Sequence, residues 1–288
     1  MTDLLIGNIK LRITGLGSLP ANAYGPFVVV ESDCHAVSGT LSVVSVPEDH
    51  TPSGSVVATG FNDLGESRLF FDGKQYTIGI SPRPDEPMRY MALSPDFRRA
   101  ALMLAPADPW AGFVIDSMLR IFFSQVAVLE SSFLIHASAV VSESGAHLFM
   151  GKSGTGKSTH SSLWIRNFKD CSLLNDDNPL VTIGSDGVST AHGTPWSGKT
   201  ECWRNLCASL VSMTRLRQAP ANVYTPLSDI EAFVAVMPGV SVISHCRWLY
   251  AMACDAISRL LPSVRVGLLE CLPDDDAAIA CRRGQNEF

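Results

Sequence analysis

The fold of this chain is decided by residues 151–158, which read Gly-Lys-Ser-Gly-Thr-Gly-Lys-Ser. The stretch matches the phosphate-binding P-loop pattern, a glycine, four residues and then Gly-Lys-Ser, at every position. Its glycines permit backbone conformations that turn successive amide N–H groups inward around an anion. We therefore expect the loop to bind a nucleoside triphosphate such as ATP or a similar polyphosphate. The predicted nucleotide-binding residues are Gly151, Ser153, Gly154, Thr155, Gly156, Lys157, Ser158 and Thr159.

Two side chains of the loop suit phosphate chemistry. Lys157 supplies a compact cation for the β- and γ-phosphates, and the Ser158 hydroxyl is a suitable Mg²⁺ ligand. A helix that begins at about this point directs the positive end of its dipole at the phosphates.

The surrounding sequence supports the motif. Residues 133–141 and 146–150 read as strands joined by a turn, and residues 159–167 read as a helix. Strand, loop and helix is the context that a P-loop requires. The alternative, a glycine-rich turn with an unrelated lysine, does not account for this context.

A pair of carboxylates follows about one helix and one strand after the loop. Residues 171–174 are mostly apolar and lead into Asn175, Asp176 and Asp177. At that separation the chain returns to the phosphates, so the pair is suited to Mg²⁺ binding and to accepting a proton from an attacking hydroxyl. The sequence leaves the order open and favours Asp176 as base and Asp177 as metal ligand. The alternative is a solvated turn at the end of a strand.

Composition narrows the class of protein. The 288 residues are 46% hydrophobic and 17% charged, with a net charge of −6, which argues against general binding to nucleic acid or an anionic membrane. The eight cysteines show no zinc spacing, so we expect reduced cysteines and a cytoplasmic protein without a signal peptide. Charged and polar residues interrupt the apolar segment 111–129, which favours an amphipathic helix over a membrane span.

The pattern of elements predicts two domains. Residues 1–105 read as β-rich, with strands over 8–14, 27–32 and 39–46 and a hairpin of 68–71 with 75–80. We expect them to form a cap or a substrate-docking subdomain. Residues 106–288 form the expected catalytic domain, an α/β fold that opens with a helix over 110–126. Its last part should contain a capping box at 228–231, helices over 247–260 and from 274, and a strand over 264–271.

These motifs together resemble a known superfamily. The segment Ile135-His136-Ala137, the loop 151–158 and the segment Leu174-Asn175-Asp176-Asp177 are similar to HPr kinase/phosphorylase and, more distantly, to ATP-dependent phosphoenolpyruvate carboxykinase. The resemblance implies a P-loop catalytic domain of that α/β fold and transfer of phosphate from Mg²⁺-ATP to a serine hydroxyl. It also places His136 near the phosphates or the acceptor; a core histidine is the alternative. Oligomers are common among such kinases, so the resemblance is compatible with a homo-oligomer.

Two features separate the chain from HPr kinase itself. Residues 1–105 do not resemble that enzyme's N-terminal domain, and the segment 192–199 looks like the smaller HPr-kinase-related proteins, which include lasso peptide precursor kinases and kinases of free serine. Lys199 or Arg204 could neutralise charge on the transferring group, and Trp196 could form a wall of the acceptor pocket. The alternative is a well-packed turn with a surface lysine.

We therefore expect a Mg²⁺-ATP-dependent kinase with Asp176, His136, Lys157 and Lys199 as catalytic residues and Ser158 and Asp177 as metal ligands. The acceptor would be a peptide, a small protein or free serine. A nucleotide-sensing module without transfer and a reversible kinase/phosphorylase are the alternatives, and the spare carboxylate favours catalysis over sensing.

Overall fold

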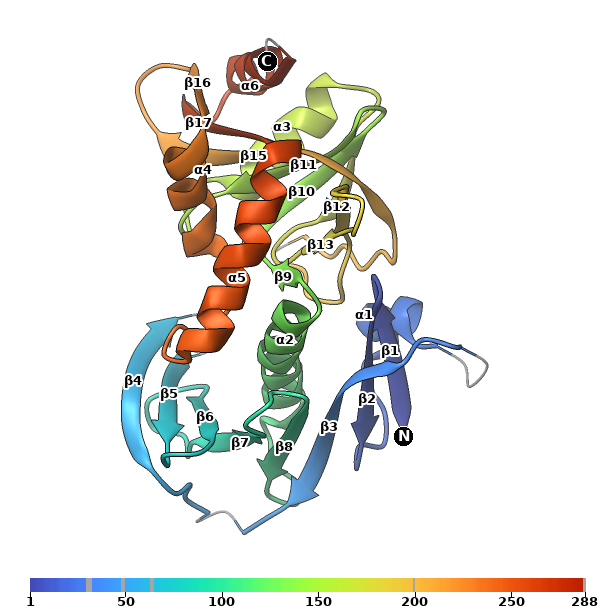
Figure 1. Cartoon of the computed structure of the whole chain (residues 1–288), viewed down its shortest axis with the longest axis vertical. Helices are drawn as coiled ribbons and strands as arrows, with labels where there is room; N and C mark the ends of the chain where they lie inside the picture. The colour runs from blue at the N-terminus through green and yellow to red at the C-terminus, as the bar shows by residue number, and fades with distance from the viewer. Residues whose placement is uncertain (30–32, 48–49, 63–64, 199, 287–288) are drawn as a thin grey trace. The chain divides into compact units, whose positions relative to one another are not determined.

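The computed structural model describes the chain except residues 30–32, 48–49, 63–64, 199 and 287–288, and the side chain of residue 62 (Figure 1). It divides into two compact units. Unit 1 comprises Met1–Ala21 and Val28–Val126, and unit 2 comprises Asn22–Phe27 and Ala127–Phe288. Each unit has its own sheet, and the chain is a mixed α/β protein.

Unit 1 is built on an eight-stranded sheet with the order β1-β2-β3-β8-β7-β6-β5-β4. Strands β2, β3 and β8 run parallel to one another, and the other neighbours are antiparallel. The strands are β1 (Thr2–Ile6), β2 (Ile9–Thr14), β3 (Val37–Ser45), β4 (Ser55–Asn62), β5 (Gly65–Phe71), β6 (Tyr76–Ser81), β7 (Arg89–Leu93) and β8 (Arg99–Leu104).

Helix α2 (Ala111–Leu129) packs on this sheet. Gly39 of β3 allows the close approach, because a Cβ there would lie 2.8 Å from Val126 and 3.2 Å from Phe122. Among the described helices, α2 alone is long and apolar enough to cross a membrane, but most of its apolar window is buried, as in a core helix.

Unit 2 contains the loop and the acid pair. Its strands order as β12-β10-β11-β15-β14-β13-β9, and β17 pairs with β15 and β16. The P-loop strand β11 runs parallel to β15, which runs parallel to β17. The strands are β9 (Ser132–Leu134), β10 (Ala137–Ser142), β11 (Gly145–Met150), β12 (Ser172–Asn175), β13 (Leu180–Ile183), β14 (Ser189–His192), β15 (Cys207–Gln218), β16 (Val223–Leu227) and β17 (Arg265–Cys271).

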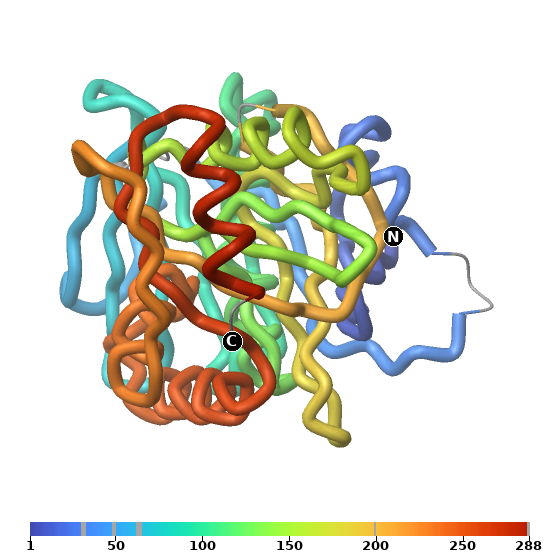
Figure 2. The backbone as a smooth tube through the Cα atoms, turned by 90° about the horizontal axis from the view of Figure 1, so that it is seen from above, coloured from blue at the N-terminus to red at the C-terminus, as the bar shows by residue number. Residues whose placement is uncertain are grey.

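Five α-helices and three short 3₁₀ turns complete the described part of unit 2. Helices α3 and α6 lie side by side, as Figure 2 shows. The α-helices are α1 (Ala21–Tyr24, whose first residue belongs to unit 1), α3 (Lys157–Asn167), α4 (Asp229–Val236), α5 (Arg247–Leu260) and α6 (Asp275–Asn286), and the 3₁₀ turns are η1 (Gly25–Phe27), η2 (Met237–Gly239) and η3 (Leu261–Ser263).

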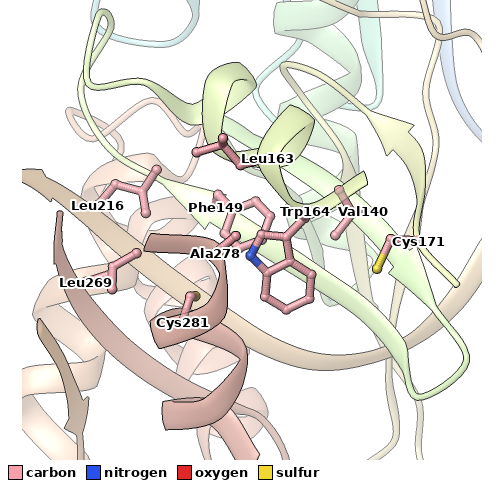
Figure 3. Close-up of a cluster of buried hydrophobic side chains, with 9 residues drawn as sticks. All are labelled: Val140, Phe149, Leu163, Trp164, Cys171, Leu216, Leu269, Ala278 and Cys281. Atoms are coloured by element: carbon pink, nitrogen blue, oxygen red, sulfur yellow. The ribbon is translucent and has the colours of Figure 1, made fainter. Parts of the chain in front are cut away.

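A hydrophobic cluster fixes α3 and α6 to the sheet (Figure 3). Trp164 of α3 is fully buried and packs on Phe149 of the P-loop strand, with ring centroids 5.2 Å apart. Cys281 of α6 lies in the same cluster, and every described cysteine is a free thiol. This packing sets the direction in which α3 leaves the loop.

Several sequence predictions need correction. The strand predicted over 133–141 is two strands, because the backbone N–H groups of Ile135 and His136 donate to the carbonyls of Pro179 and Gly239. The strand predicted over 27–32 is wrong in its described part, since Phe27 ends a 3₁₀ turn and Val28 makes one isolated bridge; residues 30–32 lie outside the description.

The predicted capping box at 228–231 is also wrong. Ser228 occupies the N-cap position without a side-chain hydrogen bond. The N–H of Glu231, which the serine side chain would have capped, donates instead to the Ser228 carbonyl. Asp229 has a φ of 47°, so the first turn is distorted.

The domain boundary was expected near residue 105. The boundary between the two units lies about one helix later in the chain, near the end of α2. The two units meet in the chain at Val126 and Ala127, because α2 packs on the first sheet. The expected helix over 110–126 and the predicted hairpin of 68–71 with 75–80 are present within a few residues.

We predict that His147 makes the stability of the protein depend on pH. Its ring lies 4.8 Å from Trp164, and its Nδ1 and Nε2 contact the hydroxyls of Ser212 and Ser142 at 2.8 and 3.1 Å. Burial, with a smaller contribution from Arg282, lowers the pKa of His147 to about 4. Between that value and an unfolded pKa of about 6.5, the unfolded chain binds the proton and the folded chain does not, so stability falls as pH falls.

This histidine should therefore contribute about 2 kcal/mol of the stability lost between about pH 7 and about pH 5. Urea unfolding at both pH values measures it, with His147→Gln as the variant that retains hydrogen bonding without titrating. His160 and His192 also have pKa values lowered to about 4 by burial, so the His147→Gln variant should still lose some stability between the two pH values, but less than wild type. An unchanged loss in the variant would contradict the assignment.

Candidate active site

The loop between β11 and α3 has the conformation that its glycines predict. Gly154 and Gly156 have φ values of 80° and 104°, which residues with a Cβ rarely adopt. Gly156 is the N-cap of α3, which begins at Lys157, two residues earlier than predicted. The loop closes on itself, because the N–H and hydroxyl of Thr155 both donate to the Lys152 carbonyl, at 3.1 and 2.7 Å.

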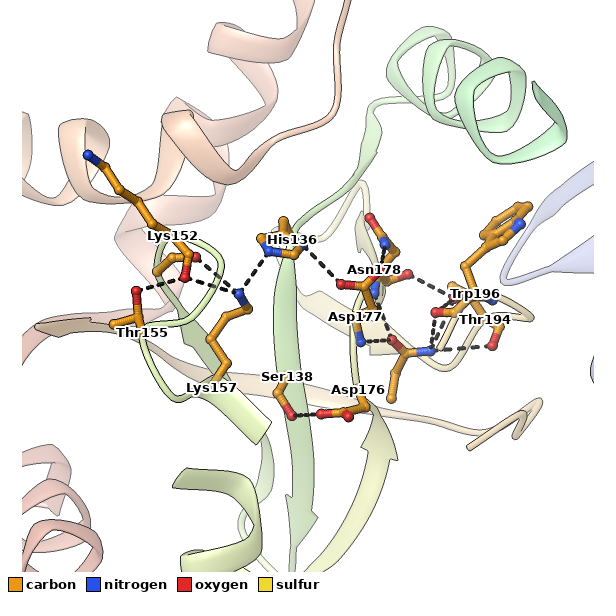
Figure 4. A network of polar contacts seen from close by, with 12 residues as sticks. His136, Ser138, Lys152, Thr155, Lys157, Asp176, Asp177, Asn178, Thr194 and Trp196 are labelled. Atoms are coloured by element: carbon orange, nitrogen blue, oxygen red, sulfur yellow. Dashed lines mark hydrogen bonds and ion pairs between the residues drawn. The ribbon is translucent and has the colours of Figure 1, made fainter. Parts of the chain in front are cut away.

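The Lys157 side chain is 8% exposed and is directed into the site (Figure 4). Its ammonium lies 2.8 Å from His136 Nε2 and donates to the carbonyls of Gly151 and Lys152 at 3.2 and 3.5 Å. The lysine therefore joins its own loop to a residue on the neighbouring chain segment.

His136 stands in the break between β9 and β10. Its Nδ1 lies 3.0 Å from Asp177 Oδ1. A lysine ammonium can only donate and a carboxylate can only accept, so Nε2 accepts from Lys157 and Nδ1–H donates to Asp177. The three side chains form one continuous line of hydrogen bonds, and the tautomer of His136 is fixed by its neighbours.

The other carboxylate is held apart from this line. Asp176 is 3% exposed; its Oδ1 accepts from the Ser138 hydroxyl at 2.8 Å, and its Oδ2 accepts from the Thr200 N–H at 3.1 Å. Ser138 lies 2.6 Å from the hydroxyl of Ser161 in α3. Asp176 is thus linked to the helix that follows the P-loop.

A buried amide shapes the turn that carries both acids. Asn175 Oδ1 accepts the N–H groups of Asp177 and Asn178 at 3.0 and 2.9 Å, and its Nδ2 donates to Thr194 Oγ1 at 3.1 Å and to the Trp196 carbonyl at 3.2 Å. The side chain of Asn178 in turn donates to Asp177 Oδ2. The site residues that were not predicted from the sequence include Asn175, Ser138 and Ser161. Asn175 could have been predicted, because an Asn side chain commonly accepts a hydrogen bond from the backbone N–H two residues later.

The structure brings together three of the four predicted catalytic residues, Lys157, His136 and Asp176, near Asp177. Ser158 and Thr159 lie in the first turn of α3, and Ser153 is exposed in the loop. Lys199 lies outside the described residues. The description of Trp196 as a wall of an acceptor pocket is wrong: it is 3% exposed, and its Nε1–H donates to Tyr24 at 3.1 Å. Arg204 donates to the Leu173 carbonyl at 3.0 Å.

Two of the depressions in the described part of the chain adjoin each other at the loop, and Gly154, Thr155, Leu216 and Gln218 line both. A cleft of about 840 Å³ includes Lys152, Ser153, Arg215 and Arg217 in its lining. A smaller slot of about 450 Å³ lies beside the first turn of α3.

The residues present fit a magnesium ion bound together with a nucleotide. Ser158 and the acid pair offer oxygen ligands, which Mg²⁺ prefers. The part of the chain that the structure describes contains no group of three or more His, Cys, Asp and Glu side chains arranged to hold a metal. Ser158 and the two carboxylates therefore suit an ion that completes its coordination with phosphate oxygens and water.

No protein-family model and no curated protein matches the chain. Among solved structures it is similar to the Hpr(Ser) kinase/phosphatase from Coxiella burnetii, with 12% identity and a TM-score of 0.32 over 54% of this chain and 91% of that chain. Values this low do not establish a shared fold, so the proposals below rest on the geometry of this chain.

We predict that Asn175→Ala destabilises the protein by about 3 kcal/mol, because it leaves two buried backbone N–H groups without their acceptor. Asn175→Asp retains an acceptor and should lose less, although its carboxylate faces the Thr194 and Trp196 oxygens. Urea unfolding compares the three proteins. Equal stability of wild type and Asn175→Ala would show that the turn does not depend on this amide.

Proposed function

We propose that the protein is a Mg²⁺-ATP-dependent kinase that transfers the γ-phosphate to a serine-type hydroxyl. One observation carries the proposal: the P-loop lysine, His136 and Asp177 form a single line of hydrogen bonds, with a second carboxylate, Asp176, next to it. A phosphate-binding loop beside two carboxylates provides for both polyphosphate binding and proton removal.

The loop and Lys157 bind and orient the polyphosphate. Backbone N–H groups and the helix dipole of α3 attract it, and the ammonium of Lys157 neutralises charge that develops during transfer. Mg²⁺, when bound, supplies further neutralisation of the β- and γ-phosphate oxygens.

The contacts favour the opposite assignment of base and metal ligand to the two acids from the one that the sequence favours. Asp176 is linked through Ser138 to Ser161, and Ser158 lies one helical turn before Ser161 on the same face of α3. We therefore assign Asp176, with Ser158, to the metal. Asp177 is more exposed, at 19% of its side chain, and contacts His136 beside Lys157, so it is assigned as the base.

The transfer step then balances in atoms and charge. The acceptor hydroxyl oxygen forms a bond to the γ-phosphorus as the bond from that phosphorus to the β–γ bridging oxygen breaks. The hydroxyl proton moves to Asp177, and ADP leaves with the bridging oxygen. His136 holds Asp177 in place by donating from Nδ1.

The acceptor is proposed to be a peptide, a small protein or free serine in the cytoplasm. We also propose that the protein forms a homo-oligomer. A nucleotide sensor needs the loop and a metal ligand but no second carboxylate in contact with a histidine. In the alternative of a reversible kinase/phosphorylase, the same residues would serve attack of inorganic phosphate on a phosphoserine: a bond forms from a phosphate oxygen to the phosphoserine phosphorus, the bond from that phosphorus to the serine oxygen breaks, pyrophosphate forms, and the serine oxygen takes the proton from Asp177.

Mass spectrometry of phosphate transfer tests the function. The protein is incubated with Mg²⁺-ATP and, separately, free serine, an HPr-like protein or a serine-containing peptide. A gain of one phosphate on a serine in one mixture, absent without Mg²⁺, would support the kinase. Tight ATP binding with no transfer to any acceptor would favour the sensor.

The paired variants Asp176→Asn and Asp177→Asn separate the two roles. Asp177→Asn should lower kcat by about 10²–10⁴-fold with ATP affinity nearly unchanged, because only the proton acceptor is lost. Asp176→Asn should raise the Mg²⁺ concentration needed for half-maximal activity.

Steady-state kinetics with Mg²⁺ titration measures both variants. Asp255→Asn, at an exposed carboxylate on α5, is the control and should behave as wild type. The reverse pattern, with the Mg²⁺ requirement changed by Asp177→Asn alone, would restore the assignment that the sequence favours.

A further inference from the structure

We propose that the slot beside α3 binds the purine base of the nucleotide. The proposal rests on the nucleotide binding proposed above and adds where the base lies and which residues select it. The slot has a volume of about 450 Å³, within the range of small-molecule sites. Its walls are largely apolar, and they are formed by Leu163, Leu216, Ala219, Leu272 and Pro273.

The slot begins where the bound phosphates would end. It is lined by Gly154 and Gly156 of the loop and by Thr159 in the first turn of α3. The γ-phosphate is expected at the other side of the loop, where Lys157 meets His136. A nucleotide with its γ-phosphate there directs its nucleoside away from β10 and toward β15 and β17.

The larger cleft borders the loop as well but suits a base less. It contains three cationic side chains, Lys152, Arg215 and Arg217, with Glu231 as the acid in its lining. A neutral heterocycle gains little from such a surface, whereas flat apolar walls remove its faces from water. The slot therefore fits the base better than the cleft does.

His160 lines the slot, and a neighbouring side chain holds its ring in place. The residue is 2% exposed, and its Nε2 accepts the indole N–H of Trp164 at 3.1 Å. The ring is neutral, because burial lowers the pKa of His160 to about 4, and its proton is consequently on Nδ1. The slot wall therefore includes a neutral ring that is held in one orientation by Trp164.

Gln218 fixes the wall opposite α3. Its side-chain amide donates to the Gly154 carbonyl at 3.3 Å, which ties the end of β15 to the loop. The neighbouring Ala219 donates its backbone N–H to the Cys271 carbonyl at 3.1 Å, which ties the same end to β17. The slot is thus bordered by elements that are hydrogen-bonded to one another.

The test compares ATP with inorganic tripolyphosphate, which has the phosphates and lacks the base. Calorimetric titration in Mg²⁺ measures the affinity of each probe for wild type and for Ala219→Trp, in which the indole fills the slot. We expect Ala219→Trp to weaken ATP by about tenfold or more and to leave tripolyphosphate within about twofold. Leu272→Trp, at the 40% exposed rim of the slot, is the second variant should Ala219→Trp fail to fold.

Val234→Trp is the matched control, since Val234 lines the larger cleft and is 61% exposed. It should leave both affinities unchanged. Selective loss of ATP binding in Val234→Trp, or equal loss of both probes in the slot variants, would overturn the assignment of the base to the slot. Wild-type protein that binds neither probe would overturn the proposed function as well, whereas tripolyphosphate binding with no preference for ATP would overturn the slot alone.

Discussion

The candidate site depends on one buried amide. Asn175 is fully buried at the end of β12, where two carboxylates follow in the chain, and it accepts the N–H groups of Asp177 and Asn178. Its own amide group donates to Thr194 and to the Trp196 carbonyl. The same side chain therefore sets the turn that separates the two acids and holds the 194–196 segment beside it. A buried amide can do this because all of these partners satisfy it at once.

The sequence predicted several residues that lie in the site, but not how the backbone and side chains are arranged around them. A complete loop motif and an acid pair at a spacing of one helix and one strand predicted that Lys157 and the carboxylates would lie close together. In the structure His136 joins Lys157 to Asp177, and Asp176 is bonded to Ser138 and Thr200 instead. The break at His136 had no local signal, since residues 133–141 are suited to a strand throughout. It arises from hydrogen bonds to Pro179 and Gly239, which lie far along the chain. Long-range contacts of this kind override local propensity.

Trp196 and Arg204, in or near the predicted segment 192–199, were expected to serve the reaction, and their described contacts are with the protein itself. Trp196 packs edge-on against Tyr24, and Asn205 donates to the Pro26 carbonyl at 2.9 Å. Both partners belong to Asn22–Phe27, a short piece of the N-terminal part that clusters with unit 2. An aromatic residue in a segment that also contains glycines fits a pocket wall and a packed turn equally well, and the burial of Trp196 distinguishes the two. One contact does reach the acids, because the Thr200 N–H donates to Asp176.

In the proposed function, charge couples the binding of a metal to the binding of the nucleotide. The chain carries a net charge of −6, and two carboxylates lie beside the loop that would hold a polyanion. One lysine and the N-terminus of α3 offset part of that repulsion, yet a triphosphate brings up to four further negative charges. A divalent cation between the carboxylates and the phosphates changes the pair from repulsive neighbours into ligands. In the proposed kinase, the acids that would weaken binding of the bare polyphosphate would therefore favour its metal complex, which is the form that phosphoryl transfer requires.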